Sequence, residues 1–259
     1  MLNIEVKHHD HKQEEHHHCA YHEATEAVDL ALFTSGECTE AQATKFWYDC
    51  WDVQVSKGMH KEPDVTKWRK GGRASKAMPN REDTDVWVVK GLEMVLGYLA
   101  YRKASDWLMW TLPDDSPAIE VLVRMDLDGV EVMGFIDRIH ITPTGELVVR
   151  DLKTGRKPDS HLQLGTYAAM LESTFDVRPR WGDYFLGRDC RPTGPVNLDP
   201  YTREYLTTEY GKIHQMRKLG LYLVNEGSHC ISCGVRDACR LKGQPEVIVD
   251  WKDKLPEYE

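Results

Sequence analysis

The sequence contains no run of about 18 apolar residues, so no segment is predicted to cross a membrane. It also has no apolar secretory segment near its start, and we therefore expect the chain to remain in the cytoplasm. No internal repeat is evident. Seven cysteines in a reducing compartment indicate metal binding or catalysis more than disulfides.

The overall composition is that of a folded protein, with 41% hydrophobic residues, 29% charged residues and eight tryptophans. A net charge of −9 argues weakly against a nucleic-acid partner, but the basic residues are unevenly spread. The stretch from Thr66 to Arg81 contains no acid, and a second basic group comprises Arg178, Arg180, Arg188 and Arg191. These groups are either solvated faces or contacts for a phosphate backbone.

The first eighteen residues carry six histidines and few apolar side chains. We expect residues 1–18 to form a disordered tail or tag-like extension. Such a tail can bind transition metals adventitiously.

Hydrophobic periodicity predicts helices over residues 21–33 and 40–55, then a glycine-containing basic loop up to Arg81. Asn80 is predicted to cap a long helix that continues towards Trp107. After Pro117 the period falls to about two residues, which indicates strands. The predicted strands are residues 119–125, 130–141, 146–153 and 180–187, and the predicted later helices are residues 161–172 and 201–224.

This order of elements predicts an α/β domain with a mixed sheet. Asp128-Gly129 and Thr144-Gly145 stand at hairpin-turn positions between the first three strands.

Three acids stand out on the first three predicted strands: Glu120 on the first, Asp137 on the second and Asp151 on the third. Adjacent strands would bring these carboxylates to one point, where they repel unless a divalent cation such as Mg²⁺ or Mn²⁺ binds between them. Lys153 lies two residues after Asp151 and so faces the same way. Its ammonium group can orient an attacking water or neutralise charge on a phosphate. The alternative is that each acid forms an ordinary surface ion pair.

Three segments together resemble the PD-(D/E)XK nuclease superfamily in its RecB-like branch: GFIDRI at 134–139, VRDLKTG at 149–155 and QLGTY at 163–167. The resemblance extends from about His22 to Cys239. It implies a restriction-endonuclease-like core with a mixed central sheet flanked by helices.

The resemblance also implies roles for individual residues. Asp137 would be the acid of the second motif, and Asp151 with Lys153 would form the third. Glu120 fits the preceding acidic position, and His22 resembles the helical histidine that completes the metal shell. Gln163 and Tyr167 match a glutamine–tyrosine motif expected to contact DNA or to organise the site.

Cys230, Cys233 and Cys239 form a second motif, because thiolates spaced so closely commonly bind one soft metal. Spacing alone favours zinc, whereas the resemblance implies a structural [4Fe–4S] cluster with a fourth, N-terminal cysteine. The family's fourth cysteine normally lies further upstream of the helical histidine than Cys19 does here. The candidates are Cys19, Cys38, Cys50, Cys190 or none, and a truncated start or incomplete ligation remains open.

The expected organisation is a tail over residues 1–18, a RecB-like nuclease domain over 19–224 with a helical insertion at about 40–112, and a cysteine module over 225–259. The resemblance implies a metal-dependent DNA exonuclease, similar to iron–sulfur exonucleases of CRISPR adaptation and their phage relatives. A recombination or CRISPR partner protein is possible, and a phage-encoded protein would act in the host cytoplasm. The alternatives are a catalytically silent DNA-binding scaffold and a zinc-stapled interaction module.

Overall fold

A computed structural model describes residues 3–5, 15–68, 70, 82–221, 230 and 239. The chain divides into two compact units, Met1–Thr207 and Thr208–Glu259. The domain boundary expected between residues 224 and 225 lies outside the described residues. In the described part of the chain, no helix is long and apolar enough to cross a membrane.

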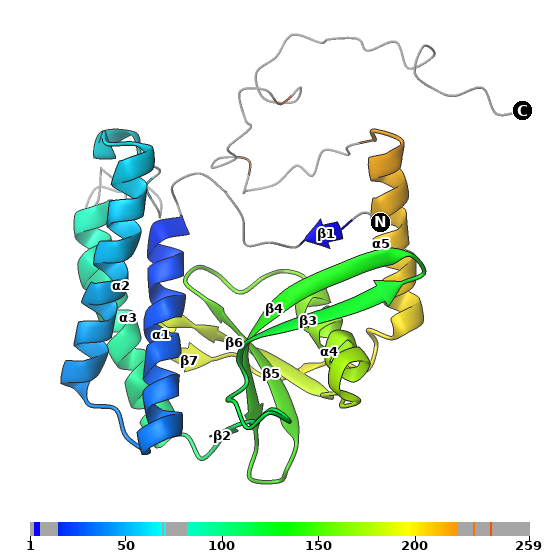
Figure 1. The fold of residues 1–259 in the computed structure, drawn as a ribbon, viewed down its shortest axis with the longest axis horizontal. Coiled ribbons are helices and arrows are strands. Elements are labelled where there is room, and N and C mark those ends of the chain that lie inside the picture. Colours follow the sequence, from blue (N-terminus) through cyan, green and yellow to red (C-terminus); the bar gives the residue numbers. More distant parts are fainter. Residues whose placement is uncertain are drawn as a thin grey trace, which may run out of the picture. The chain divides into compact units, whose positions relative to one another are not determined.

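Three long helices stand side by side in the first unit (Figure 1). They are α1 (Glu15–Ser35), α2 (Glu40–Lys61) and α3 (Thr84–Ala104). The helix predicted over residues 21–33 is confirmed and is longer than expected, since it begins inside the histidine-rich segment. The helix predicted over residues 40–55 is also confirmed, and it continues to Lys61.

Local side-chain bonds explain where two of these helices begin. Thr39 and Gln42 form a reciprocal capping box at the start of α2. Asp83 caps α3 by accepting a hydrogen bond from the backbone N–H of Val86. The predicted cap at Asn80 is therefore wrong, and α3 ends at Ala104, before Trp107.

The crossing of α2 and α3 depends on one small residue, Gly91. The Trp47 indole lies against it, and a Cβ atom at Gly91 would stand 2.0 Å from Trp47 Cη2. Trp47 is fully buried, and its indole N–H donates to the carbonyl of Val88 at 2.8 Å. The two helices therefore approach more closely than a larger residue would allow.

We expect Gly91→Ala to destabilise the protein by about 1–3 kcal/mol, because Trp47 has to leave its packed position. Gly211→Ala is the matched control, since nothing lies within 4 Å of the added methyl group in that helix. The control should be neutral or stabilising by up to about 1 kcal/mol. Denaturant unfolding of both variants measures the difference, and equal midpoints would contradict the packing described here.

An eight-stranded mixed sheet forms the centre of the first unit. The main strands are β3 (Ile119–Leu127), β4 (Val130–Ile141), β5 (Leu147–Lys153) and β6 (Trp181–Leu186). β4 pairs antiparallel with β3 and β5, whereas β6 runs parallel to β5. The predicted strands and the mixed sheet are confirmed, and the predicted turn glycines, Gly129 and Gly145, both have a φ of +84°.

Short strands that the sequence pattern did not predict complete the sheet. β1 (Asn3–Glu5) runs parallel to β4, and β2 (Leu108–Met109) pairs with the other end of β4. β7 (Arg191–Pro192) and β8 (Val196–Asn197) both pair with β6. Most of these pairings involve only two residues, which is too short for a period of two to be recognised.

Helices cover the sheet and extend from it. α4 (Leu162–Phe175) packs against β3, β5 and β6. The last helix, α5 (Arg203–Lys218), is shorter at both ends than the predicted residues 201–224. Two 3₁₀ turns, Val65–Lys67 and Gly187–Asp189, lie between the longer elements.

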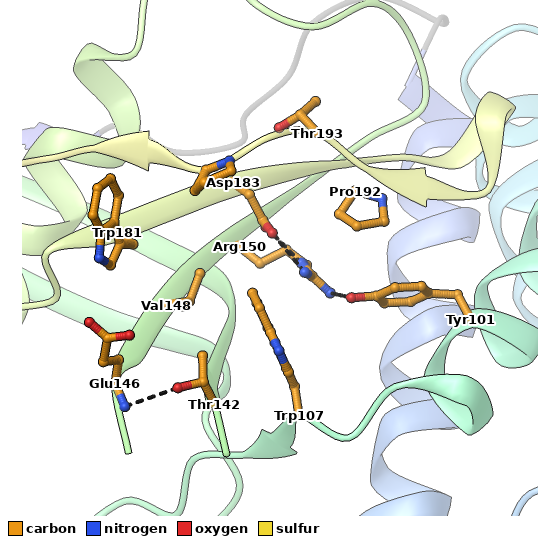
Figure 2. A pocket seen from close by; sticks show the side chains of 11 residues that line it. Tyr101, Trp107, Thr142, Glu146, Val148, Arg150, Trp181, Asp183, Pro192 and Thr193 are labelled. Atoms are coloured by element: carbon orange, nitrogen blue, oxygen red, sulfur yellow. Dashed lines mark hydrogen bonds and ion pairs between the residues drawn. The ribbon is translucent and has the colours of Figure 1, made fainter. Parts of the chain in front are cut away.

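A buried ion pair connects β5 to β6. Arg150 is fully buried and donates to both carboxylate oxygens of Asp183 at 2.7 Å. Its third hydrogen bond goes to the Tyr101 hydroxyl, and the rings of Tyr101 and Trp107 lie 5.0 and 5.1 Å from the guanidinium carbon. A cavity of about 330 Å³ opens beside this pair, with Trp181 on its wall (Figure 2).

Candidate metal centre

The three predicted acids lie in one row across adjacent strands. The pairing of Ile119 with Arg138 and of Val121 with Ile136 places Glu120 opposite Asp137. The pairing of Arg138 with Arg150 places Asp151 next to Asp137 on the other side. Side chains in one row share a face of the sheet, so the three carboxylates converge.

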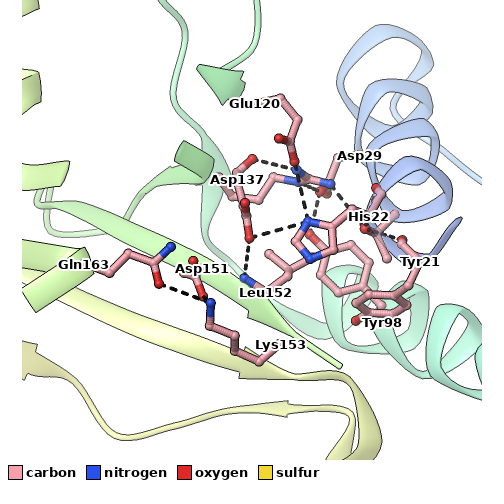
Figure 3. Close-up of polar contacts among 12 residues, drawn as sticks. Tyr21, His22, Asp29, Tyr98, Glu120, Asp137, Asp151, Leu152, Lys153 and Gln163 are labelled. Atoms are coloured by element: carbon pink, nitrogen blue, oxygen red, sulfur yellow. Dashed lines mark hydrogen bonds and ion pairs between the residues drawn. The ribbon is translucent and has the colours of Figure 1, made fainter. Parts of the chain in front are cut away.

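Helix α1 adds a histidine to this row. His22 Nδ1 lies 3.8 Å from Glu120 Oε1 and 3.6 Å from Asp137 Oδ2 (Figure 3). The three ligand atoms of His22, Glu120 and Asp137 all lie within 4.8 Å of one another. An imidazole nitrogen with carboxylate oxygens suits a divalent cation such as Mg²⁺ or Mn²⁺.

Two backbone features fix the carboxylates. Asp137 Oδ2 accepts a hydrogen bond of 2.6 Å from the N–H of Leu152, which holds its side chain towards β5. Glu120 has a φ of +48°, a left-handed conformation that is rare for residues other than glycine. Such a conformation costs about 1–3 kcal/mol, and it commonly persists where a side chain is needed for function.

Lys153 lies on the same face of β5 as Asp151, as the strand period predicts. Its Nζ atom is 2.7 Å from Asp151 Oδ2 and donates to Gln163 Oε1 at 3.2 Å. Gln163 in turn donates to the Tyr167 hydroxyl at 2.9 Å, one turn further along α4. Leu152 points the opposite way and joins the core beneath α1 and α3.

The geometry therefore brings together all seven residues singled out in the nuclease-like motifs, although Asp151 stands outside the compact group of three ligand atoms. A family model, the PD-(D/E)XK nuclease superfamily, matches residues 20–240. The chain belongs to the PD-(D/E)XK nuclease superfamily.

Two phage proteins are similar over most of their length. The Gene 69 protein of Mycobacterium phage D29 is 32% identical over 228 residues, covering 85% of this chain and 82% of the relative. The Gene 69 protein of Mycobacterium phage L5 is 29% identical over 245 residues, covering 85% and 83%. The membership implies a nucleic-acid substrate and the use of divalent metal.

Burial and mutual repulsion shift the pKa values of two acids in this candidate metal centre. Burial and the neighbouring Asp137 together raise the pKa of Asp151 to about 7, although Lys153 opposes this shift. Burial also raises the pKa of Asp137, although His22 opposes this shift. For His22, burial lowers the pKa but the nearby carboxylates outweigh it, so the pKa is raised overall.

These shifts give metal-dependent stability a definite pH dependence. Because the pKa of Asp151 is raised in the folded protein, its protonated side chain stabilises the fold. This stabilisation is complete below the ordinary pKa of an aspartate and is lost as the pH rises through about 7. At pH 8 the Asp151 carboxylate is charged, and a bound divalent cation offsets the lost stability. At pH 6 the cation has to displace the proton from this carboxyl group before it can bind. We expect Mn²⁺ to raise the melting temperature more at pH 8 than at pH 6.

Thermal unfolding with Mn²⁺ or EDTA at both pH values measures this effect. Asp151→Asn should shrink the difference between the two increments, because the titrating carboxyl group is gone. If Mn²⁺ raised the melting temperature of the unaltered protein equally at pH 8 and pH 6, Asp151 would not be the group that couples metal binding to pH.

Sequence reasoning missed two residues behind the carboxylates, Arg138 and Asp29. Arg138 Nη1 donates to Glu120 Oε1 at 3.2 Å, and Arg138 Nε donates to Asp29 Oδ2 at 2.6 Å. The available signal was an arginine directly after a site aspartate within a predicted strand. Arg138 is fully buried in the structure, and a buried charge needs a partner.

The cysteine motif is described only in part. Cys230 and Cys239 are half-buried, whereas Cys233 lies outside the described residues. Among the described residues, no group of cysteines forms a metal-ligating cluster. Burial raises the pKa of Cys38, and it raises that of Cys50 to about 11, which disfavours the thiolate that a metal requires. Cys19 and Cys190 are half-buried.

The two basic groups differ in how much of them is described. Residues 69 and 71–81 of the first group lie outside the described residues. In the second group, Arg178, Arg180 and Arg188 each pair with an acid, at 2.6, 3.0 and 2.7 Å respectively. These three arginines therefore form ion pairs within the protein.

Proposed function

We propose that this protein is a metal-dependent DNA exonuclease of the RecB-like branch. The observation that carries the proposal is the group of His22, Glu120 and Asp137, whose ligand atoms lie within 4.8 Å beside the Lys153–Asp151 pair. The donor set fits Mg²⁺ or Mn²⁺. The Lys153 ammonium group beside it can stabilise the negative charge that develops on a phosphate.

The proposed metal ligands are His22, Glu120, Asp137 and Asp151. A divalent cation bound there would act as a Lewis acid towards a phosphate oxygen and lower the pKa of a coordinated water. Lys153 holds its ammonium group against Asp151 and can donate a hydrogen bond to the attacking water or to the phosphate. Gln163 restrains Lys153, and Tyr167 restrains Gln163, so the pair orients the lysine.

We propose DNA as the substrate, with single strands or duplex ends entering beside α4. The proposed role is in DNA recombination, repair or phage or CRISPR DNA processing, with a recombination or CRISPR protein as partner. The similarity to two phage proteins supports a phage setting, in which the enzyme would act in the host cytoplasm. Cleavage of end-labelled DNA shows whether the enzyme removes nucleotides from one end.

For the cysteine motif we propose a structural [4Fe–4S] cluster on Cys230, Cys233 and Cys239, with zinc as the alternative. Closely spaced thiolates are the ligands that both groups prefer. Anaerobically purified protein with visible absorption, iron and sulfide supports the cluster. Stoichiometric zinc without iron contradicts it.

The deciding experiment is a nuclease assay on end-labelled single- and double-stranded DNA with Mn²⁺, Mg²⁺ or EDTA. The six histidines of residues 1–18 are replaced with asparagine so that metal bound there does not contribute. Cleavage that requires metal supports the proposal. No cleavage of either DNA with either metal contradicts it and favours a catalytically silent scaffold.

A further inference from the structure

Arg138 connects the candidate metal centre to the helical layer behind it. It lies on β4 directly after Asp137, and it is fully buried. One edge of its guanidinium group donates to Glu120 at 3.2 Å and to the carbonyl of Asp137 at 2.6 Å. Its Nε atom donates to Asp29 Oδ2 at 2.6 Å. Arg138 therefore contacts a proposed ligand on one side and α1 on the other.

Helix α1 presents three polar residues to this strand from one face. His22, Thr25 and Asp29 are three and four residues apart, so they lie on the same side of the helix. His22 approaches Asp137, while Thr25 accepts from Arg138 Nη2 at 3.3 Å. Docking α1 onto Arg138 therefore sets the position of His22.

Asp29 is itself fixed from the other side. Its Oδ1 atom accepts from Arg102 Nε at 2.8 Å, and its Oδ2 atom accepts from the Tyr98 hydroxyl as well as from Arg138. Tyr98 and Arg102 both lie on α3, whereas Arg138 lies on β4. A carboxylate held by three donors with no exposed surface is a rigid anchor for the guanidinium group.

We propose that Arg138 and Asp29 form a positioning pair that sets the affinity of the site for one divalent cation. The Glu120 side chain is 30% exposed and stands on a left-handed backbone, so Arg138 is what keeps its carboxylate turned inwards. The same guanidinium holds α1, and with it His22, at ligand distance. This inference rests on the metal site in the proposed function and assigns the two residues that organise it.

The neighbouring strand supplies a matched control for this pair. Arg150 is the cross-strand partner of Arg138, is equally buried, and also pairs with a buried aspartate. It donates a further hydrogen bond to a tyrosine hydroxyl. Its hydrogen bonds go to Asp183 and Tyr101, which are not among the proposed ligands. Weakening the Arg150 pair therefore perturbs the core to a similar extent without touching Glu120 or His22.

The test compares Arg138→Lys and Asp29→Asn with Arg150→Lys and Asp183→Asn. Melting temperature, Mn²⁺ affinity by titration, and cleavage rate across a range of Mn²⁺ concentrations are measured for each. We expect all four variants to melt earlier, but only the first two to bind Mn²⁺ about 10–100-fold more weakly. Saturating Mn²⁺ should restore most of the cleavage rate in those two, because the ligands themselves are intact.

Mn²⁺ affinity equal to that of the unaltered protein in Arg138→Lys and Asp29→Asn would overturn the proposal. An equal loss of Mn²⁺ affinity in the control variants, Arg150→Lys and Asp183→Asn, would also overturn it. If neither primary variant folds, Thr25→Ala removes one contact to Arg138 and should still weaken Mn²⁺ binding, and unchanged binding there overturns the proposal. Mn²⁺ binding by the unaltered protein without DNA cleavage contradicts the proposed function alone. Absence of Mn²⁺ binding contradicts both.

Discussion

Replacing Lys153 with alanine is expected to slow DNA cleavage by about 10²–10⁴-fold, the range found when a group that assists proton transfer is removed. Lys153 contacts Asp151 and Gln163 but is not a proposed metal ligand. Mn²⁺ affinity should therefore change little. DNA binding should also survive, because one lysine contributes a small part of a backbone interface.

Single-turnover cleavage and DNA affinity measured in Ca²⁺ separate these effects. Lys157→Ala is the control, since Lys157 is exposed in the loop that follows β5. We expect its cleavage rate to stay close to that of the unaltered protein. Retained cleavage in Lys153→Ala would show that another group activates the water.

Asp137→Asn is expected to abolish metal-dependent cleavage and, at the same time, to raise the melting temperature of the metal-free protein. Asp137 lies at the centre of the carboxylate row. Its loss removes one of the three grouped ligand atoms, the others being those of His22 and Glu120. The burial that raises its pKa also makes its charge costly to hold without a cation. The asparagine oxygen can still accept the hydrogen bond from Leu152.

Thermal unfolding in EDTA and in Mn²⁺ measures both parts of this prediction. Asp183→Asn serves as the contrasting variant, because it removes a carboxylate that is already paired with Arg150. It should lower the melting temperature in EDTA and leave the increment from Mn²⁺ in place. A lower melting temperature for metal-free Asp137→Asn would contradict the idea that the acids repel one another.

The acidic row followed from the sequence because it depends on local rules. The period of two residues placed Asp151 and Lys153 on one face, and the turn at Asp128-Gly129 fixed how β3 and β4 align. Once the strands were aligned, Glu120 and Asp137 had to be neighbours. The mixed sheet and most helix positions followed in the same way from periodicity.

Interactions between distant segments were not predictable in that way. Asp29 and Arg138 are 109 residues apart in sequence, and no local pattern pairs them. The left-handed backbone at Glu120 also has no sequence signal, because the residue is neither glycine nor asparagine. The cap at Asp83 was missed because another polar residue nearby, Asn80, had a similar propensity.

The placement of His22 on α1 has a consequence for the order of folding. The other proposed ligands come from β3, β4 and β5, so the centre is complete only after α1 has docked on the sheet. Bringing such distant segments together costs loop-closure entropy before their contacts form, so we expect α1 to dock on the sheet after the folding transition state. A bound cation would then slow unfolding and leave the refolding rate almost unchanged. The metal would therefore increase the kinetic stability of the folded protein.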